Sequence, residues 1–183
     1  YFYMLMLLMI PLLGFGQTII QVEAGTDQIA AALATANAGD TIELVSPGGV
    51  YVESATTLID KPVTIRAAAD LAEKPTWTTD DDSRLINLAS DLSLDGILFD
   101  GSLGAGPTED CIRLADSVRN QNLRVNDCVF QYFDDGLGEG HAIKAGSDDG
   151  MDSLIVTNSL FQPMMDEHSS VKDENELIQP GPG

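Results

Sequence analysis

Three polar residues, Asn87, Arg113 and Lys144, occupy the same position in a short apolar pattern that recurs along the chain. The pattern reads Leu-Ile-Asn-Leu, then Cys-Ile-Arg-Leu, then Ala-Ile-Lys-Ala, so each polar residue follows an isoleucine. An arginine can neutralise a carboxylate, and a lysine can accept a proton when a neighbouring cation disfavours its charged form. Arg113 and Lys144 are therefore candidate catalytic residues for a reaction that needs a neutralised carboxylate and a proton acceptor. Asn87, Arg113 and Lys144 are together candidate substrate-binding residues.

A simpler interpretation of this column also stays open. Exposed lysine and arginine side chains on a strand usually form no more than a solvated surface. Four acidic residues around the third copy are candidate oxygen ligands for Ca²⁺, namely Glu139, Asp148, Asp149 and Asp152. Their spacing matches no dedicated calcium-binding loop, so the metal ligands stay unassigned.

The other candidate residues follow weaker patterns. His141 and His168 do not have the spacing of zinc ligands, so both are expected on the surface or in loops. Trp77 and Tyr132 could stack on sugar rings, although isolated aromatic residues in loops usually pack locally. The column described above therefore stays the main candidate for chemistry.

A longer pattern recurs at constant spacing and must position this column. The segments Leu92–Phe99, Leu123–Phe130 and Leu154–Phe161 begin 31 residues apart. Their apolar residues alternate, as on a strand with one buried face. The fifth position always holds a residue type that enters the left-handed backbone region at low cost: Gly96, Asp127 or Asn158. A strand, a bend and a second strand at a fixed period predict stacked coils.

Stacked coils of this kind predict an all-β fold, a right-handed parallel β-helix of about four to five coils. Equivalent side chains of adjacent coils would lie about 4.8 Å apart. Two core ladders are predicted, whose members are Ile86, Ile112 and Ile143 in one, and Phe99, Phe130 and Phe161 in the other. The outward positions of the same strands would bring Asn87, Arg113 and Lys144 side by side.

The beginning of the chain predicts a cap for this solenoid. Thr18–Val22 is expected to form a first strand, and Gln28–Ala36 a short helix that covers the end of the core. Thr26 and Asp27 offer oxygens to the helix N-terminus, and Gly39 is expected to supply the stop.

Three segments rich in Gly, Asp and Pro are expected to leave the coils as loops: Lys74–Trp77, Gly101–Asp110 and Tyr132–Gly140. The chain has two cysteines, too few for a disulfide scaffold. The alternation of buried positions predicts that Cys128 faces inward and Cys111 outward, so no disulfide between them is expected.

The chain divides into three segments. Residues 1–16 form an uncharged apolar run that resembles a signal peptide incomplete at its start, with a cut before Gln17; an uncleaved anchor is the alternative. Residues 17–162 form the β-helix domain, and residues 163–183 an acidic loop or tail without a convincing cap. We therefore expect a secreted protein, extracellular or periplasmic, whose solenoid is truncated at the C-terminal end.

The formal net charge of −20 limits the partners. Such an acidic surface repels nucleic acid and anionic membranes. We therefore expect no nucleic-acid partner, and no membrane partner after signal cleavage. The charge is compatible with Ca²⁺ as a cofactor, but it could equally serve only to keep a secreted protein soluble. Neither composition nor pattern indicates the oligomeric state.

Several segments resemble a known family. Asp27–Leu44 with Gly48–Tyr51 is similar to the opening of secreted right-handed parallel β-helix proteins of the pectate-lyase-like architecture. Asn126–Phe130 and Thr157–Phe161 resemble the recurring rungs of the same proteins, and the resemblance is closest to the chondroitinase B and alginate lyase group. It covers about residues 18–162.

The resemblance implies an activity that the residues alone do not. In the lyases it implies a Ca²⁺-assisted β-elimination on uronate-containing polysaccharides, with a Lys base and an Arg on neighbouring coils. In those enzymes the metal-ligand cluster, and the Lys and Arg that follow it, normally lie in later coils, and the cluster has no matching residues here. The resemblance therefore implies that the catalytic coils of a lyase would be absent from this chain. Two hypotheses follow: a secreted, lyase-like protein that acts on an acidic polysaccharide, or a non-catalytic solenoid that binds glycans or serves as a surface adhesin.

Overall fold

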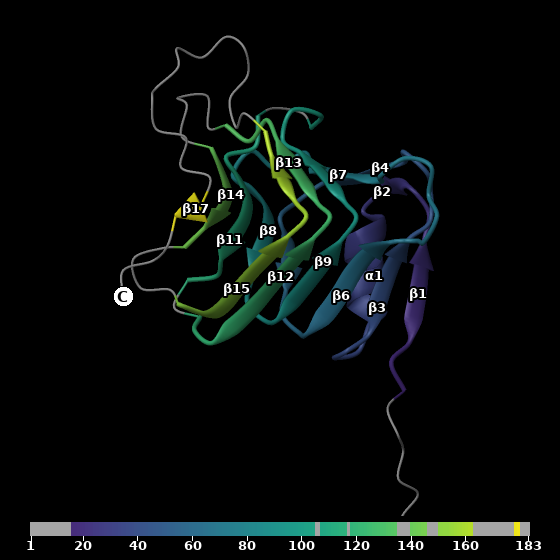
Figure 1. Cartoon of the computed structure of the whole chain (residues 1–183), viewed down its shortest axis with the longest axis horizontal. Helices are drawn as coiled ribbons and strands as arrows, with labels where there is room; N and C mark the ends of the chain where they lie inside the picture. Colours follow the sequence, from purple (N-terminus) through teal and green to yellow (C-terminus); the bar gives the residue numbers. More distant parts are fainter. Residues whose placement is uncertain are drawn as a thin grey trace, which may run out of the picture.

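The computed structural model describes residues 16–104, 107–116, 118–134, 140–145, 150–162 and 178–179. It confirms the predicted solenoid, because nearly all of these residues form coils of short parallel strands around one core (Figure 1). The coils form three parallel sheets, and one short helix lies near the beginning of the chain, after the first two strands. Among the described residues no helix is long and apolar enough to cross a membrane.

Each coil contributes one strand to each sheet, except the first, in which α1 (Gln28–Thr35) follows β1 and β2 in place of a strand of the third sheet. The first sheet contains β1 (Ile19–Val22), β3 (Thr41–Leu44), β6 (Val63–Ala67), β9 (Leu92–Asp95), β12 (Gln121–Asn126) and β15 (Met151–Thr157). The second contains β2 (Gly25–Thr26), β4 (Val50–Glu53), β7 (Thr76–Thr79), β10 (Leu98–Asp100), β13 (Val129–Gln131) and β16 (Leu160–Phe161). The third contains β5 (Thr57–Ile59), β8 (Arg84–Leu88), β11 (Asp110–Leu114), β14 (His141–Lys144) and β17 (Ile178–Gln179).

Both predicted core ladders are present. Ile86, Ile112 and Ile143 are register partners in the third sheet and are buried. In the second sheet Phe99 and Phe130 stack with ring centroids 4.8 Å apart, and Phe130 and Phe161 with centroids 5.0 Å apart. Parallel in-register pairing places identical side chains directly over one another, and this is why a fixed period predicts such ladders.

The aromatic ladder is longer than the sequence indicated. Trp77 is fully buried, and its ring lies 5.7 Å from the ring of Phe99. Tyr51 continues the ladder as the register partner of Trp77. The prediction of a loop over Lys74–Trp77 was therefore wrong at its end, because Thr76 and Trp77 begin strand β7. Trp77 is a core residue and is not available to stack on a sugar.

The bend between the first and second sheets also follows the prediction. Gly96, Asp127 and Asn158 have φ angles of 74°, 50° and 53°, all in the left-handed region. At Gly96 there is also little space, because a Cβ atom there would lie 3.1 Å from the Cβ of Ala67. Each coil therefore turns at a residue that tolerates a positive φ.

Gly96→Val is expected to destabilise the fold by about 1–3 kcal/mol, because a β-branched side chain must enter the left-handed region beside Ala67. Urea unfolding followed by circular dichroism measures the loss. Asn158→Gly is the control, because Asn158 is the equivalent bend residue between β15 and β16. It should change stability by about 1 kcal/mol or less. Equal losses in the two variants would contradict the expected strain at residue 96.

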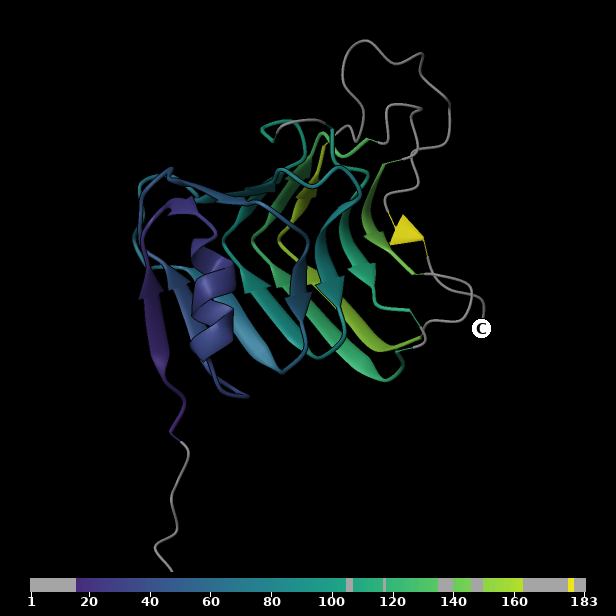
Figure 2. The ribbon, with the colours of Figure 1, turned by 180° about the vertical axis from the view of Figure 1, so that it is seen from behind.

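Helix α1 (Gln28–Thr35) covers one end of the core, as predicted, with Ile29 and Leu33 buried (Figure 2). Its caps differ from the prediction. Asp27 has a φ of 57° and makes no side-chain cap, because its carboxylate accepts hydrogen bonds from Ser54. The helix ends at Thr35, before Gly39, so Gly39 does not supply the stop.

Two side chains from the coils hold the ends of α1 instead. The carboxylate of Glu53 accepts hydrogen bonds from the backbone N–H groups of Ile29 at 3.0 Å and Ala30 at 3.2 Å. Lys61 Nζ donates to the carbonyl oxygens of Leu33 and Ala36 at the other end. A carboxyl group thus lies at the helix N-terminus and a cation at the C-terminus, the ends at which the helix dipole favours an acidic and a basic side chain.

Both cysteines are buried free thiols, so the expectation of no disulfide is confirmed. The outward position predicted for Cys111 was wrong, because Cys111 and Ile112 are buried in succession. The equivalent pairs of the neighbouring coils, 85–86 and 142–143, are buried in the same way. Strict alternation therefore fails where the chain enters the third sheet. Burial raises the pKa of both thiols, that of Cys128 to about 11.

Candidate functional site

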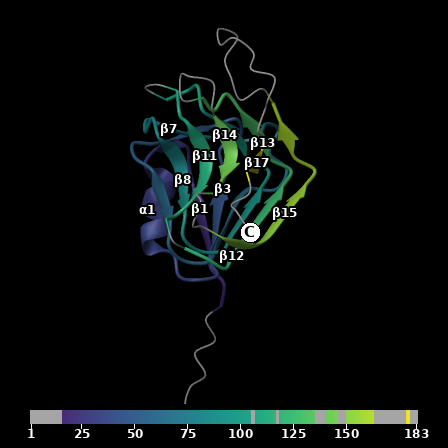
Figure 3. The ribbon, with the colours of Figure 1, turned by 90° about the vertical axis from the view of Figure 1, so that its left-hand side faces the viewer.

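The column predicted from the sequence exists on the outer side of the third sheet. Arg113 is the register partner of Asn87 on one side and of Lys144 on the other. The three strands that carry these residues, β8, β11 and β14, lie side by side (Figure 3). Leu58 extends the column as the register partner of Asn87, with 51% of its surface exposed. The column thus changes from apolar to polar to cationic along the solenoid axis.

Both cations of the column contact carboxylates. Lys144 Nζ donates to Glu109 Oε1 at 2.7 Å and lies 3.7 Å from Asp110 Oδ1. Arg113 Nη1 lies 3.4 Å from Asp110 Oδ2. The side chains of Arg113 and Lys144 keep 27% and 19% exposure, so solvent and ligands can reach them.

Asp110 is the centre of this group and was not a candidate in the sequence. Its side chain is fully buried, and its Oδ1 lies 3.0 Å from Nδ1 of His141 in the next coil. His141 is buried to within 9% exposure, so the surface or loop position expected for it was wrong. Arg84, Asp110 and His141 are register partners in successive coils and form a second polar column beside the first.

This arrangement can bind an anionic group. Arg113 and Lys144 are partly exposed donors on adjacent coils, a spacing that suits the two oxygens of a carboxylate or sulfate. The ammonium group of Lys144 donates a hydrogen bond to Glu109 Oε1, so in this geometry it serves as a cation and not as a proton acceptor. Asn87 lies beside the two donors as the register partner of Arg113, and its buried Oδ1 makes no hydrogen bond with any described residue.

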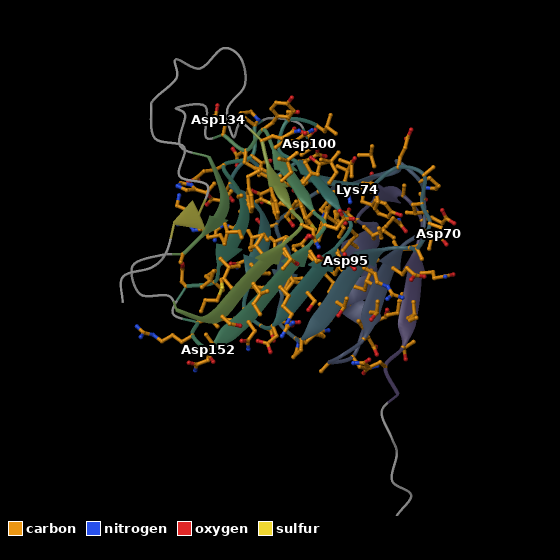
Figure 4. The ribbon with its side chains drawn as sticks, in the orientation of Figure 1. Asp70, Lys74, Asp95, Asp100, Asp134 and Asp152 are labelled. Carbon is orange, nitrogen blue, oxygen red and sulfur yellow. The ribbon has the colours of Figure 1, made fainter. Side chains whose placement is uncertain are left out.

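The remaining sequence candidates lie away from this column. Asp152 is exposed on β15, at the edge of the first sheet (Figure 4). Tyr132 is 37% exposed with a φ of 59°. Four candidates fall outside the described residues: Glu139, Asp148, Asp149 and His168. Within the described part of the chain, no three His, Cys, Asp or Glu side chains come together as a metal site.

A concave region lies away from this column, at the bend between the first and second sheets. It is a hollow of about 270 Å³ lined by Asp70, Glu73, Lys74, Asp95 and Asp127, among others. Lys74 Nζ donates to Asp127 Oδ2 at 2.6 Å, and Lys74 and Asp95, both labelled in Figure 4, line the hollow. This ion pair links the loop over residues 71–75 to the bend between β12 and β13, two coils farther along the solenoid.

Comparison with known proteins places the fold. No protein-family profile and no curated protein sequence matches the chain. The solved structure of the PL6 family alginate lyase AlyGC matches with a TM-score of 0.68 and 25% identity over 83% of this chain. A point variant of AlyGC matches with a TM-score of 0.66 and 26% identity over the same share. The matched region is 21% of each of those chains, so this chain spans about a fifth of their length. The chain is therefore a β-solenoid that structurally resembles a PL6 alginate lyase, within the β-helix group of the chondroitinase B and alginate lyase type.

Proposed function

We propose that this chain belongs to a secreted protein that acts on acidic polysaccharides by β-elimination, with the column on the third sheet as a binding surface for uronate groups. The observation that carries the proposal is the pair Arg113 and Lys144, partly exposed on adjacent coils of a solenoid that resembles an alginate lyase. Cleavage of a uronate polymer requires neutralisation of the carboxylate and removal of the neighbouring proton.

The column supplies the first requirement. Arg113 and Lys144 would hold the uronate carboxylate, with Asn87 as a further polar contact and Leu58 as an apolar surface for the face of an adjoining sugar ring. Lys144 would accept a proton only after release from Glu109, to which it donates at 2.7 Å. The sequence resemblance also implies Ca²⁺ as a cofactor. Glu109 and Asp110 already contact cations and do not fit as its ligands, so a bound Ca²⁺ would need other residues.

The reaction is tested with the full-length protein. Incubation with alginate, pectin and chondroitin sulfate, with and without Ca²⁺, is expected to yield unsaturated ends that absorb ultraviolet light. The combination of substrate and Ca²⁺ that gives product identifies the polysaccharide and the metal requirement. A lack of product from every acidic polysaccharide would count decisively against a lyase.

One observation favours a second function, a non-catalytic solenoid that binds glycans. Lys144 contacts a carboxylate at hydrogen-bonding distance, which suits a binding cation better than a proton acceptor. In this case the protein would bind acidic glycans without product, most strongly at low salt, because screening weakens the attraction of an exposed charge.

The variant Arg113→Ala with Lys144→Ala separates the two functions. A lyase that uses the column is expected to lose roughly a hundredfold or more of its turnover while it keeps its fold, because the transition-state charge loses both cations. A binder is expected to lose affinity alone, and more at low salt. The control is Arg119→Ala with Arg124→Ala, which removes the same charge from two exposed residues elsewhere. Unchanged turnover and affinity would show that the column is a solvated surface.

A further inference from the structure

We propose that Asp110 is a positioning residue for the anion-binding column, that is, Asn87, Arg113 and Lys144. Its buried carboxylate would hold the side chains of Arg113 and Lys144 in place. The inference rests on the proposed function, in that the column is taken to bind acidic glycans. It adds a role for a carboxylate that would otherwise oppose the binding of an anion.

The contacts of Asp110 span two coils. It lies 3.4 Å from Arg113 Nη1 in its own strand, 3.0 Å from His141 Nδ1 in the next strand and 3.7 Å from Lys144 Nζ. A carboxylate can accept several hydrogen bonds at once, so one group can orient donors from both strands. Its two oxygens are divided between the strands, Oδ2 toward Arg113 and Oδ1 toward His141 and Lys144.

Burial distinguishes Asp110 from the other carboxylate of the site. The side chain of Asp110 is fully buried, so its orientation is fixed by the surrounding protein, and its contacts are shielded from water. Glu109 lies closer to Lys144, at 2.7 Å, but it is 28% exposed and has no contact with Arg113 among the described residues. Glu109 is therefore a surface partner of one cation, whereas Asp110 links both cations to the framework of the solenoid.

Neutralising Asp110 and neutralising Glu109 are expected to change the affinity for an acidic glycan in different ways. Removal of a negative charge beside an anion site should strengthen anion binding if charge alone matters. Asp110→Asn is instead expected to weaken the binding of an alginate oligosaccharide about tenfold, because Arg113 and Lys144 lose their common support. Glu109→Gln is expected to leave the affinity unchanged or to raise it about twofold.

The test compares wild type, Asp110→Asn and Glu109→Gln by titration with the oligosaccharide at low and moderate salt, after circular dichroism has shown that each variant is folded. Weaker binding in Asp110→Asn with equal or tighter binding in Glu109→Gln supports the proposal. Binding in Asp110→Asn as tight as in wild type, or equal losses in both variants, overturns it. If Asp110→Asn does not fold, His141→Gln takes its place, because it removes the 3.0 Å contact and keeps Asp110. Unchanged affinity in that variant overturns the proposal as well.

A second measurement needs no glycan and so separates this proposal from the proposed function. Reductive methylation with ¹³C labels each lysine, and the NMR signal of Lys144 reports its surroundings. In Asp110→Asn this signal is expected to move toward that of a freely exposed lysine, while those of Lys61 and Lys74 stay in place. If wild type binds no acidic glycan but the Lys144 signal moves, the proposed function fails and the positioning role stands. A Lys144 signal that does not respond overturns the positioning role.

Discussion

Phe130→Ala is expected to lower the free energy of unfolding by about 3–5 kcal/mol. Phe130 is fully buried, and its ring is stacked between Phe99 at 4.8 Å and Phe161 at 5.0 Å. Truncation would remove a large apolar surface and leave a cavity between two aromatic rings, which the parallel register holds apart. Urea unfolding followed by circular dichroism measures this loss.

Phe161→Ala is the matched control, because it makes the same change in the same ladder. Phe161 is only partly buried and stacks on Phe130 from one side among the described residues, so its loss should cost about 1–2 kcal/mol. A loss below about 1 kcal/mol for Phe130→Ala would mean that the ring does not fill the core as described.

The regular part of the fold could be predicted because one cause repeats. Coils of 31 residues bring Leu92, Leu123 and Leu154 into register, and each contact then recurs in the next coil. Bends with positive φ restrict the residue type at a single position, so the sequence shows them directly. Periodicity of this kind depends on backbone geometry and is visible without any knowledge of distant contacts.

The misplaced residues lie where the period is weak. Trp77 belongs to a coil whose first strand begins at Val63, 29 residues before Leu92, and Lys74-Pro75 beside it resembles a loop. Its assignment to the core depends on pairing with Tyr51 and Phe99 in the two neighbouring coils. Cys111 was misplaced for a related reason, since a corner of the coil turns two successive side chains inward.

The column of the candidate site could be predicted, but the residue beneath it could not. Register alone places Asn87, Arg113 and Lys144 side by side. Asp110 stands in a segment rich in Gly and Pro that looked like a loop, and its burial depends on surrounding residues distant in sequence. A signal did exist, because Arg84 and Asp110 precede Asn87 and Arg113 by three residues each, and His141 precedes Lys144 by three. The repeat thus contains two polar positions, of which only the second was recognised.

Glu53 is expected to make the fold less stable as pH rises from 4.5 to 7. A carboxylate in an ion pair has the opposite effect, because its pKa is lowered by folding. Its side chain lies between α1 and the coils, with the residue only 1% exposed. Burial raises the pKa of this carboxyl from 4.5 to about 7, while the N–H groups of Ile29 and Ala30 oppose the rise and Asp27 adds to it. Loss of solvation therefore outweighs the attraction of the helix N-terminus for the charged form.

The sign follows from the proton balance. Below pH 4.5 Glu53 is protonated in the folded and unfolded states, so its contribution to stability is fully present. Between pH 4.5 and 7 the unfolded chain releases this proton and the folded chain keeps it, so each pH unit favours unfolding. The contribution lost by pH 8 amounts to about 3 kcal/mol.

Glu53→Gln isolates this effect, because the amide oxygen can still accept from the helix N-terminus and the side chain no longer titrates. Unfolding of both proteins by urea between pH 4 and 8 gives two stability curves, whose difference removes the contributions of all other groups. The free energy of unfolding of the variant, relative to that of wild type, is expected to increase by about 3 kcal/mol from pH 4 to 8. Most of this change should occur between pH 4.5 and 7. A constant difference would show that Glu53 keeps an ordinary pKa. If instead wild type became more stable relative to the variant as pH rises, the helix N-terminus would stabilise the charged carboxylate more than burial disfavours it.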